Sequence, residues 1–343
     1  MATAAALAAP FPYFGGKRRA APLVWAVLGD PAGYVEPFAG SAAVLLGRPP
    51  FVGRRVETLN DADGWLINTW RAIQAEPAEV AAYAWGPVSE IDYHARLAWL
   101  QERRTPELVA WLEGDPEAHD AKAAGWWLYV VACGIGDPFG PGPWRVIDGY
   151  LRRLPHLGNA GQGVNRALPH LGDAGQGRDD REGATQARES TASCRTSATQ
   201  ARLAAYLTAL SHRLERVRIT CGDWRRVVSS SVTRAGTGGD GTRALFLDPP
   251  YATSGDLYAH GDGTLSAEVR DWCLSRDARG LLIVLCGYDT EHDDLLNHGW
   301  TVTEGKAGGG AGYSSRADNG RRERLWLSPG CHIAQDTLFG AGS

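Results

Sequence analysis

The chain lacks the features that mark several common classes of protein. None of its 343 residues belongs to an apolar run near the roughly 20 residues that a membrane-spanning helix needs. Its six cysteines form no CxxC pair and its nine histidines show no metal-ligand spacing, so neither a disulfide framework nor a metal site is indicated. The first ten residues lack the pattern of a signal peptide. We therefore expect a soluble, cytoplasmic protein without a metal or a membrane partner.

An overall excess of positive charge is also missing. The formal net charge is -4, which argues against a general polyanion-binding protein. The charge is uneven, however, because the stretch from Arg145 to Arg226 holds 14 Arg and Lys against 8 Asp and Glu, a local excess of +6. Such a stretch fits either a nucleic-acid footprint or a solvated, Arg-rich linker, and composition leaves both open.

Short apolar runs bounded by turn residues predict buried strands. They cover residues 34–37, 55–59, 217–221, 244–247, 281–286, 300–304 and 323–327. Helical stretches such as 64–74 and 266–275 separate most of these runs, which indicates an α/β fold with a mainly parallel sheet. A Gly-rich turn at 308–312 joins the last two runs, which predicts an antiparallel hairpin at the sheet edge.

A long segment between the second and third strands interrupts this alternation. Residues 78–153 begin with helical patterns and end in Gly and Pro breakers, so we predict a helical insertion. We expect its tryptophans in the helical core, except Trp144, which with Arg145 is a candidate DNA contact. A polar, Gly-rich unit is then duplicated within residues 154–201, which predicts a flexible loop. Residues 10–77 and 202–330 would form the core, and residues 331–343 a flexible tail.

The strongest chemical signal is Asp248-Pro249-Pro250-Tyr251, directly after a predicted strand. Two prolines cannot continue a helix or a central strand, so the chain leaves the sheet at the carboxyl end of that strand, where open α/β sheets bind ligands. The carboxylate and the next carbonyl can accept hydrogen bonds from an exocyclic amine, and the phenol ring can stack on a flat base. An ordinary turn is the alternative interpretation of this motif alone.

Three further motifs lie toward the amino end. Glu36-Pro37-Phe38-Ala39-Gly40 is a small-residue turn between a strand and a helix, where a nucleotide-like ligand can meet backbone amides. Asp61 follows the next strand, about 20 positions on, and can bind ribose hydroxyls or cap the helix at 64–74. Tyr13-Phe14-Gly15-Gly16-Lys17 is too short for a P-loop, but its ammonium can meet a carboxylate or a phosphate.

Together these motifs resemble the DNA adenine methylase family, whose members transfer a methyl group from S-adenosylmethionine (AdoMet) to N6 of adenine. Gly15-Gly16-Lys17, the Glu-Pro-Phe-x-Gly turn, Asn60-Asp61 and Asp-Pro-Pro-Tyr occur in the family's order, with the insertion placed as in its alpha arrangement. The resemblance covers residues 11–71 and 217–328. It implies a Rossmann-like AdoMet-dependent methyltransferase sheet, double-stranded DNA as the partner, and the insertion at 78–153 as the target-recognition region.

The resemblance also implies roles for single residues. Asp248 and Tyr251 would hold a flipped-out adenine, with Pro249 and Pro250 between them in the catalytic motif. The residues that would contact AdoMet are Tyr13, Lys17, Glu36, Phe38, Gly40, Asp61, Asp223 and Trp224. The sequence departs from the family at Ala42, where a second glycine is common, so a close backbone approach is not implied there.

Other activities share parts of this pattern. N4 methylation of cytosine uses a similar motif, more often with Ser at the place of Asp248, and N6-adenine methylation of ribosomal RNA uses related motifs. A catalytically silent DNA-binding relative would also keep the fold. No cysteine follows a proline, which argues against C5-cytosine methylation. Restriction partner, replication mark and phage self-protection all stay open as biological roles.

The tail offers one candidate partner. Gln335, Leu338 and Phe339 resemble the Gln-x-x-Leu-Phe peptides that attach bacterial replication and repair proteins to the sliding clamp. A flexible tail can order on such a partner as its two apolar side chains enter a pocket. The alternative is a tail whose Leu and Phe pack on the protein's own sheet.

Overall fold

The structure is a computed structural model, and it divides into two compact units. The residues that it describes are 7–13, 17–51, 53–134, 139, 144–147, 150–153, 197–234, 241–250, 264–275, 278–304 and 322–332. The sheet unit comprises Gly15–Ala62, Arg216–Arg218 and Gly222–Ser343, and the helical unit comprises Met1–Phe14, Asp63–Glu215 and Ile219–Cys221. Among the described residues, no helix has both the length and the apolar character needed to cross a membrane.

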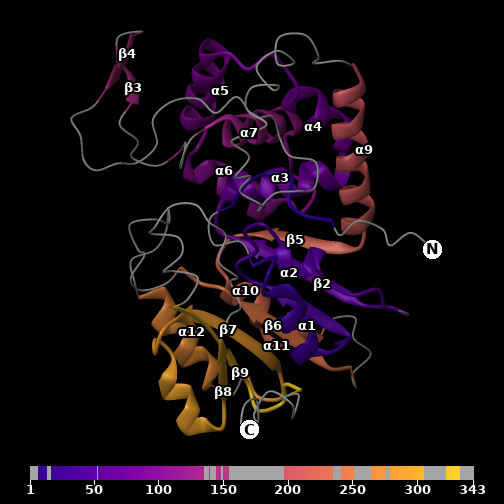
Figure 1. The fold of residues 1–343 in the computed structure, drawn as a ribbon, viewed down its shortest axis with the longest axis vertical. Helices are drawn as coiled ribbons and strands as arrows, with labels where there is room; N and C mark the ends of the chain where they lie inside the picture. Colours follow the sequence, from indigo (N-terminus) through magenta and orange to yellow (C-terminus); the bar gives the residue numbers. More distant parts are fainter. Residues whose placement is uncertain are drawn as a thin grey trace, which may run out of the picture. The chain divides into compact units, whose positions relative to one another are not determined.

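Seven strands form one mixed sheet (Figure 1). They are β1 (Gly33–Glu36), β2 (Val56–Asp61), β5 (Val217–Cys221), β6 (Arg243–Leu247), β7 (Leu282–Tyr288), β8 (Thr301–Glu304) and β9 (Glu323–Leu327). Their order across the sheet is β5-β2-β1-β6-β7-β9-β8. β1 pairs in parallel with β2 and β6, as does β6 with β7, whereas β9 runs antiparallel to β7 and β8. The parallel sheet and the antiparallel edge hairpin predicted from the sequence are thus confirmed.

The strand order identifies the fold class. Numbered along the chain, the seven strands lie in the order 3-2-1-4-5-7-6, and this arrangement matches the fold of AdoMet-dependent methyltransferases. The order reverses between β1 and β6, because the chain first runs outward through β2 and β5 and then returns to the other side of β1. In open α/β sheets such a switch point is where ligands bind, beyond the carboxyl ends of the strands.

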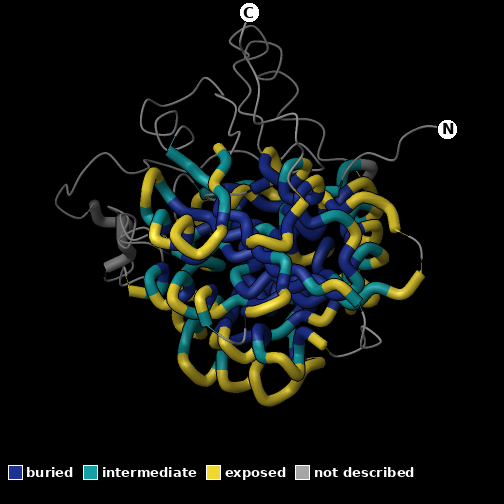
Figure 2. The backbone as a smooth tube through the Cα atoms, turned by 90° about the horizontal axis from the view of Figure 1, so that it is seen from below, coloured by how far each residue is buried: buried dark blue, intermediate teal, exposed yellow. Residues whose placement is uncertain are grey.

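The central strands are buried, which explains their continuous apolar sequences. Every residue of β1 and four of the five residues of β6 are buried, as expected for parallel strands covered on both faces. Figure 2 colours the buried stretches of the backbone dark blue and the exposed ones yellow. The helices of the sheet unit are α1 (Ala21–Leu28), α2 (Ala43–Leu46), α10 (Arg225–Val228), α11 (Ser230–Arg234), α12 (Leu265–Cys273) and the 3-10 helix η2 (Asp293–His298).

The helical unit contains most of the predicted insertion together with two further helices. Its helices are α3 (Gly64–Ala75), α4 (Pro77–Ala84), α5 (Glu90–Glu102), α6 (Pro106–Gly114), α7 (Ala121–Cys133) and α9 (Ser197–Leu214). α7 packs tightly on α4 at Gly125, where a Cβ atom would come within 2.4 Å of the Cβ of Tyr83. That contact needs glycine, although glycine lowers helix propensity. The sequence-based domain boundaries stay a prediction.

Two features of the helical unit differ from the sequence expectations. β3 (Trp144–Ile147) and β4 (Tyr150–Arg153) form a two-stranded antiparallel ribbon inside the segment expected to be helical. The tryptophans at 85, 99, 111, 126 and 127 were expected in the core, but of these Trp127 alone is buried, and Trp111 is 45% exposed. α9 begins at Ser197, inside the predicted flexible loop, whose residues up to 196 lie outside the described part of the chain.

Candidate active site

Strand pairing places two carboxylates, those of Asp248 and Glu323, at one edge of the sheet. β6 ends at Leu247, which lies in register with Leu285 of β7, so Asp248 follows β6 beside the last residues of β7. β9 runs the opposite way, and its first residue, Glu323, lies in register with Tyr288 at the end of β7. The carboxyl ends of β6 and β7 and the amino end of β9 therefore meet at this edge.

Lys17 binds both carboxylates at this edge. Its Nζ lies 2.7 Å from Oδ2 of Asp248 and 2.9 Å from Oε1 of Glu323. The side chain of Lys17 is only 6% exposed, against 20% for Asp248 and 13% for Glu323. Burial alone would lower the pKa of Lys17, but the two carboxylates outweigh it and hold this pKa well above its ordinary value. The ammonium therefore stays charged at neutral pH.

The thiol of Cys286 lies beside Asp248 in the same group, and Lys17, Asp248, Glu323 and Cys286 are together called the Lys17 cluster. Burial, and then the negative charge of Asp248, raise the pKa of Cys286 well above its ordinary value, so the thiol stays protonated and can donate a hydrogen bond to Asp248. A buried neutral thiol is a poor nucleophile. The other cysteines that the structure describes are also buried and form no disulfide.

Asn60 connects the ends of three strands on the other side of the switch point. Its side-chain amide, 1% exposed, donates to the carbonyl of Pro37 at 3.1 Å and to that of Gly222 at 2.9 Å. Its own backbone carbonyl accepts a hydrogen bond from the amide of Ala39 at 2.8 Å. Because Pro37 follows β1 and Gly222 follows β5, Asn60 fixes the turns at the carboxyl ends of both strands.

Asp61 contacts the glycine turn rather than capping a helix. Its Oδ2 accepts a hydrogen bond from the amide of Gly40 at 3.0 Å. The residue that caps α3 is Asp63, whose carboxylate accepts from the amides of Trp65 and Leu66. The alternative role of Asp61 as a helix cap is therefore wrong. The structure brings together Gly40 and Asp61, two of the residues expected to bind the cofactor.

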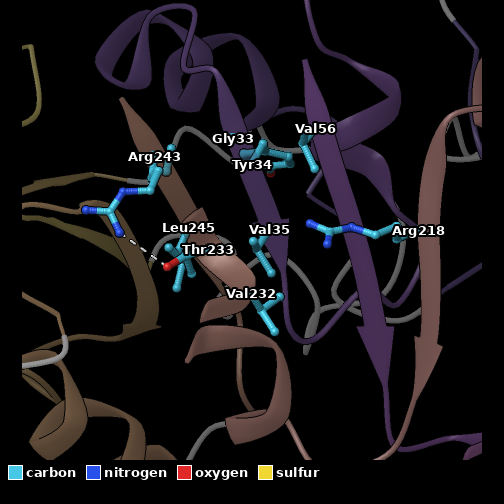
Figure 3. A pocket seen from close by; sticks show the side chains of 10 residues that line it. Gly33, Tyr34, Val35, Val56, Arg218, Val232, Thr233, Arg243 and Leu245 are labelled. Carbon is cyan, nitrogen blue, oxygen red and sulfur yellow. Dashed lines mark hydrogen bonds between the residues drawn. The ribbon is translucent and has the colours of Figure 1, made fainter. Parts of the chain in front are cut away.

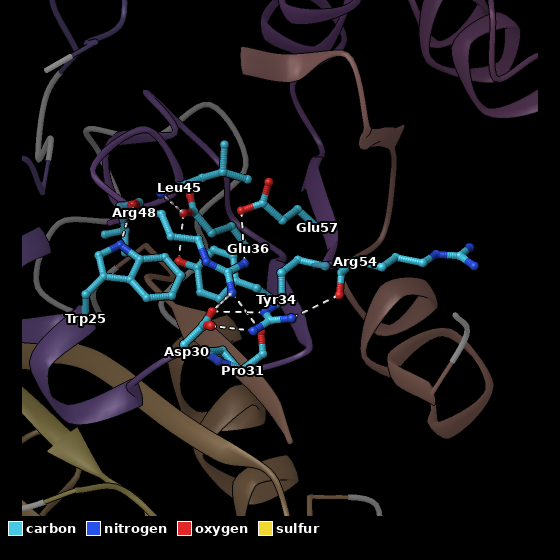
Figure 4. Close-up of polar contacts among 11 residues, drawn as sticks. Trp25, Asp30, Pro31, Tyr34, Glu36, Leu45, Arg48, Arg54 and Glu57 are labelled. Carbon is cyan, nitrogen blue, oxygen red and sulfur yellow. Dashed lines mark hydrogen bonds and ion pairs between the residues drawn. The ribbon is translucent and has the colours of Figure 1, made fainter. Parts of the chain in front are cut away.

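Glu36 is engaged inside the sheet unit (Figure 4). Its Oε1 accepts hydrogen bonds from the hydroxyl of Tyr34 at 2.7 Å and from the amide of Leu45 at 2.5 Å, and the residue is 1% exposed. These bonds hold α2 against the end of β1. Arg48, in the same view, forms a separate ionic cluster with Asp30 and Glu57.

Ala42 adopts a backbone conformation that favours glycine. It precedes α2 with φ 50° and ψ 29°, in the left-handed region, and its side chain is fully buried. The turn thus holds an alanine in a conformation that favours glycine. A β-branched side chain in this conformation is strained, because its extra methyl groups meet the neighbouring backbone.

The strain at Ala42 gives a prediction for stability. We expect Ala42→Val to lower the free energy of unfolding by about 2 kcal/mol, whereas Ala42→Gly changes it by less than about 1 kcal/mol, because relief of strain offsets the lost methyl group. Urea unfolding measures both. Ala43→Val is the matched control, since Ala43 lies in the helix itself, and a cost there as large as at Ala42 would contradict this explanation.

The remaining predicted cofactor residues lie in different surroundings. The ring of Phe38 lies 6.0 Å from that of Trp224, which is 4% exposed and belongs to the core. Asp223 is exposed and forms an ion pair with Arg225 at 3.0 Å. Tyr13 belongs to the helical unit and is 38% exposed.

Several predicted positions lie outside the residues that the structure describes. Pro249 is buried and Pro250 partly buried, but the described chain stops there, before Tyr251. The tail residues Gln335, Leu338 and Phe339 are outside it as well. Within the described residues, no group of three or more His, Cys, Asp or Glu side chains is placed to hold a metal ion.

A hollow on the sheet lies away from these residues (Figure 3). It is lined by Gly33, Tyr34, Val35, Val56, Arg218, Val232, Thr233, Arg243, Ala244 and Leu245. Gly33 and Arg243 are the first residues of their strands, so the hollow lies toward the amino ends of β1 and β6. Asp248 and Gly40 follow the carboxyl ends of these same strands, and the hollow is therefore not the candidate active site.

No model of a known protein family matches this chain, and no curated protein matches it. The fold is compatible with AdoMet binding, and the glycine turn and the Lys17 cluster both lie beyond the strand ends where that fold class binds ligands.

Sequence reasoning missed Glu323 and Cys286 as members of the site. Glu323 appeared there as the first residue of an apolar run, and Cys286 as the last residue of another. Only the pairing of β9 with β7 brings the two residues to the same edge. The one available signal was an acidic residue at the start of a strand that continues as Arg-Leu-Trp-Leu.

Proposed function

We propose that the protein is an AdoMet-dependent DNA methyltransferase that modifies N6 of adenine. The observation that carries this proposal is the contact between Lys17 and Asp248, at 2.7 Å. It joins the amino-terminal Gly-Gly-Lys motif and the Asp-Pro-Pro-Tyr motif at one edge of a methyltransferase-type sheet. The two motifs are far apart in the sequence, and their meeting at this edge is what a single shared site requires.

The residues beyond β1 and β2 fit AdoMet. A half-buried carboxylate at Asp61 can accept hydrogen bonds from ribose hydroxyls, and the Gly40 turn permits close approach of a ligand. The partly buried ring of Phe38 offers an apolar face to a flat base. AdoMet, when bound, supplies an electrophilic methyl group on a positively charged sulfur, which takes the bonding electrons as the methyl group moves to N6 and N6 loses a proton to water.

Asp248 is the residue we assign to the target base. Its carboxylate accepts a hydrogen bond from the N6 amino group and so orients the nitrogen and offsets the positive charge that develops on it. The carbonyl of Pro249 is a second acceptor in the same motif. An adenine inside a duplex cannot reach this edge, so the base must leave the stack. We also propose that the ring of Tyr251 stacks on the flipped-out adenine, and this role rests on the resemblance to the DNA adenine methylase family.

Transfer of labelled methyl groups from AdoMet to DNA, followed by analysis of the nucleosides, tests the proposed function. We expect N6-methyladenine as the product, with no transfer by the Asp248→Asn variant. Detection of N4-methylcytosine would mean that cytosine is the target base. Labelling of ribosomal RNA instead of DNA would mean that RNA is the substrate. AdoMet binding without transfer to any nucleic acid would identify a catalytically silent relative. Methylation-aware sequencing of the same DNA then gives the recognised site.

The contact between Asp61 and the glycine turn gives a prediction for cofactor affinity. We expect Asp61→Ala to weaken AdoMet binding by about 1–3 kcal/mol, because a charged acceptor is lost and the amide of Gly40 loses its partner. Calorimetric titration measures this change. Asp63→Ala is the matched control, since it removes the cap of α3 and should lower stability without changing AdoMet affinity. Equal affinities for Asp61→Ala and the wild type would remove the cofactor role.

A further inference from the structure

We propose that Glu323 is a positioning residue for methyl transfer, which acts by sharing the Lys17 ammonium with Asp248. The inference rests on the proposed function. Without Glu323, the ammonium would neutralise Asp248 alone and compete with the target amino group for its carboxylate. With Glu323 present, the ammonium of Lys17 is shared between two carboxylates. Asp248 is then only partly neutralised and remains a strong hydrogen-bond acceptor for the target amino group.

The geometry supports an ammonium that is shared between two carboxylates. An ammonium has three N–H donors, and the two carboxylate contacts of Lys17, at 2.7 and 2.9 Å, are of nearly equal length. They come from separate strand ends, Asp248 after β6 and Glu323 at the start of β9. Because Lys17 is 6% exposed, bulk water does little to screen these contacts. A change in one carboxylate therefore changes the hold of Lys17 on the other.

The charge of the cluster matches the needs of the reaction. One ammonium and two carboxylates leave one net negative charge, since the Cys286 thiol stays neutral. Nitrogen gains positive charge as the N6–methyl bond forms, and it keeps that charge until its proton leaves. A fixed negative charge beside the nitrogen stabilises this stage more than the starting state, which is the condition for catalysis. Removal of Glu323 would leave Asp248 and Lys17 as a neutral pair.

The buried position of Glu323 depends on its contact with Lys17. The carboxylate is 13% exposed and begins a strand whose later residues, such as Trp326, are fully buried. Removing a carboxylate from water is unfavourable unless a partner compensates. Glu304, on the neighbouring strand β8, is in a different environment. Its side chain is 80% exposed, and its Oε1 lies 3.9 Å from Nη2 of Arg324.

The first test compares Glu323→Gln with the wild type in steady-state methyl transfer to DNA. We expect kcat to fall by about ten-fold, with KM for DNA and Kd for AdoMet changed by less than about two-fold. Glu304→Gln is the matched control and should keep the wild-type kcat. Should Glu323→Gln fail to fold, Glu323→Asp keeps the charge but withdraws it by one methylene group, and we expect a smaller fall in kcat of the same kind. A folded Glu323 variant with wild-type kcat would overturn the inference.

A second test repeats the substitution in the Lys17→Met background, where the sign should reverse. Without the ammonium, the two carboxylates repel each other and Asp248 is driven toward its protonated form, which is a poor acceptor. Removing Glu323 relieves that repulsion, so Lys17→Met/Glu323→Gln should have a higher kcat than Lys17→Met alone. A role of Glu323 that is independent of Lys17 would instead give losses that add in both backgrounds. Additive losses would overturn the inference while leaving the proposed function intact, whereas a wild type that transfers no methyl group to DNA would end both.

Discussion

Replacement of Asp248 by Asn should abolish methyl transfer to DNA, with a fall in kcat of at least about 100-fold, while AdoMet binds with an affinity within about two-fold of the wild type. The reason is that Asn keeps the size of the side chain but removes the negative charge. Its amide offers donors as well as an acceptor to the target amino group, and the positive charge that develops on nitrogen is no longer offset. Single-turnover transfer measures the first effect and calorimetric titration the second.

The Asp248→Asn variant also needs a control for folding. Lys17 keeps its contact with Glu323, so the buried ammonium retains one carboxylate partner and the sheet edge should stay folded. Asp294→Asn is the matched substitution, because the Asp294 side chain is 75% exposed and only 3.5 Å from Arg270 in a surface pair. Near-wild-type transfer by a folded Asp248→Asn protein would refute the role of Asp248, and loss of AdoMet binding would move that role to the cofactor.

The strands could be predicted because burial leaves a simple trace in the sequence. β6 and β7 are parallel and covered on both faces, so they appear as unbroken apolar runs, and each predicted strand ends within two residues of the observed one. The site residues that follow such strands were also predictable, because a turn after a buried strand must lie at its carboxyl end. Asp248 and Asp61 were found in this way.

Other features depended on contacts that the sequence does not specify. Asp61 and Asp63 are both acidic residues before α3, and spacing alone fits either as the cap, so the structure was needed to separate them. Glu323 belongs to the site because β9 lies between β7 and β8. A hairpin predicted from a Gly-rich turn does not reveal which of its two strands pairs with β7. Had β8 taken that place, Glu323 would lie one strand farther from Asp248.

Substitution of Lys17 by Met should strongly lower the stability of the sheet unit. It leaves the carboxylates of Asp248 and Glu323 beside each other, without the ammonium that lies between them. Removing one partner of a buried ion pair costs about 3–5 kcal/mol, because the remaining charge has lost its compensation. Urea unfolding at pH 8 should show a loss of this size. Lys122→Met is the matched control, because Lys122 has no carboxylate partner among the described residues and lies over the rings of Trp99 and Trp126, so its loss should cost about 1 kcal/mol or less.

The pH dependence of Lys17→Met should distinguish this explanation from a simple loss of packing. In the wild type the pKa of Lys17 is raised above its ordinary value of 10.5, so its contribution to stability is complete below pH 10.5 and is lost only as the pH rises further. In the variant, repulsion between the carboxylates raises the pKa of one of them above its unfolded value. Such a carboxylate costs least at low pH, where it is protonated in both the folded and the unfolded state. Its cost grows as the pH rises above the unfolded pKa, and it is complete above the folded pKa. The difference in unfolding free energy between the wild type and Lys17→Met should therefore be smaller at pH 5 than at pH 8, and an equal difference at both values would mean that Lys17 acts through packing instead of charge.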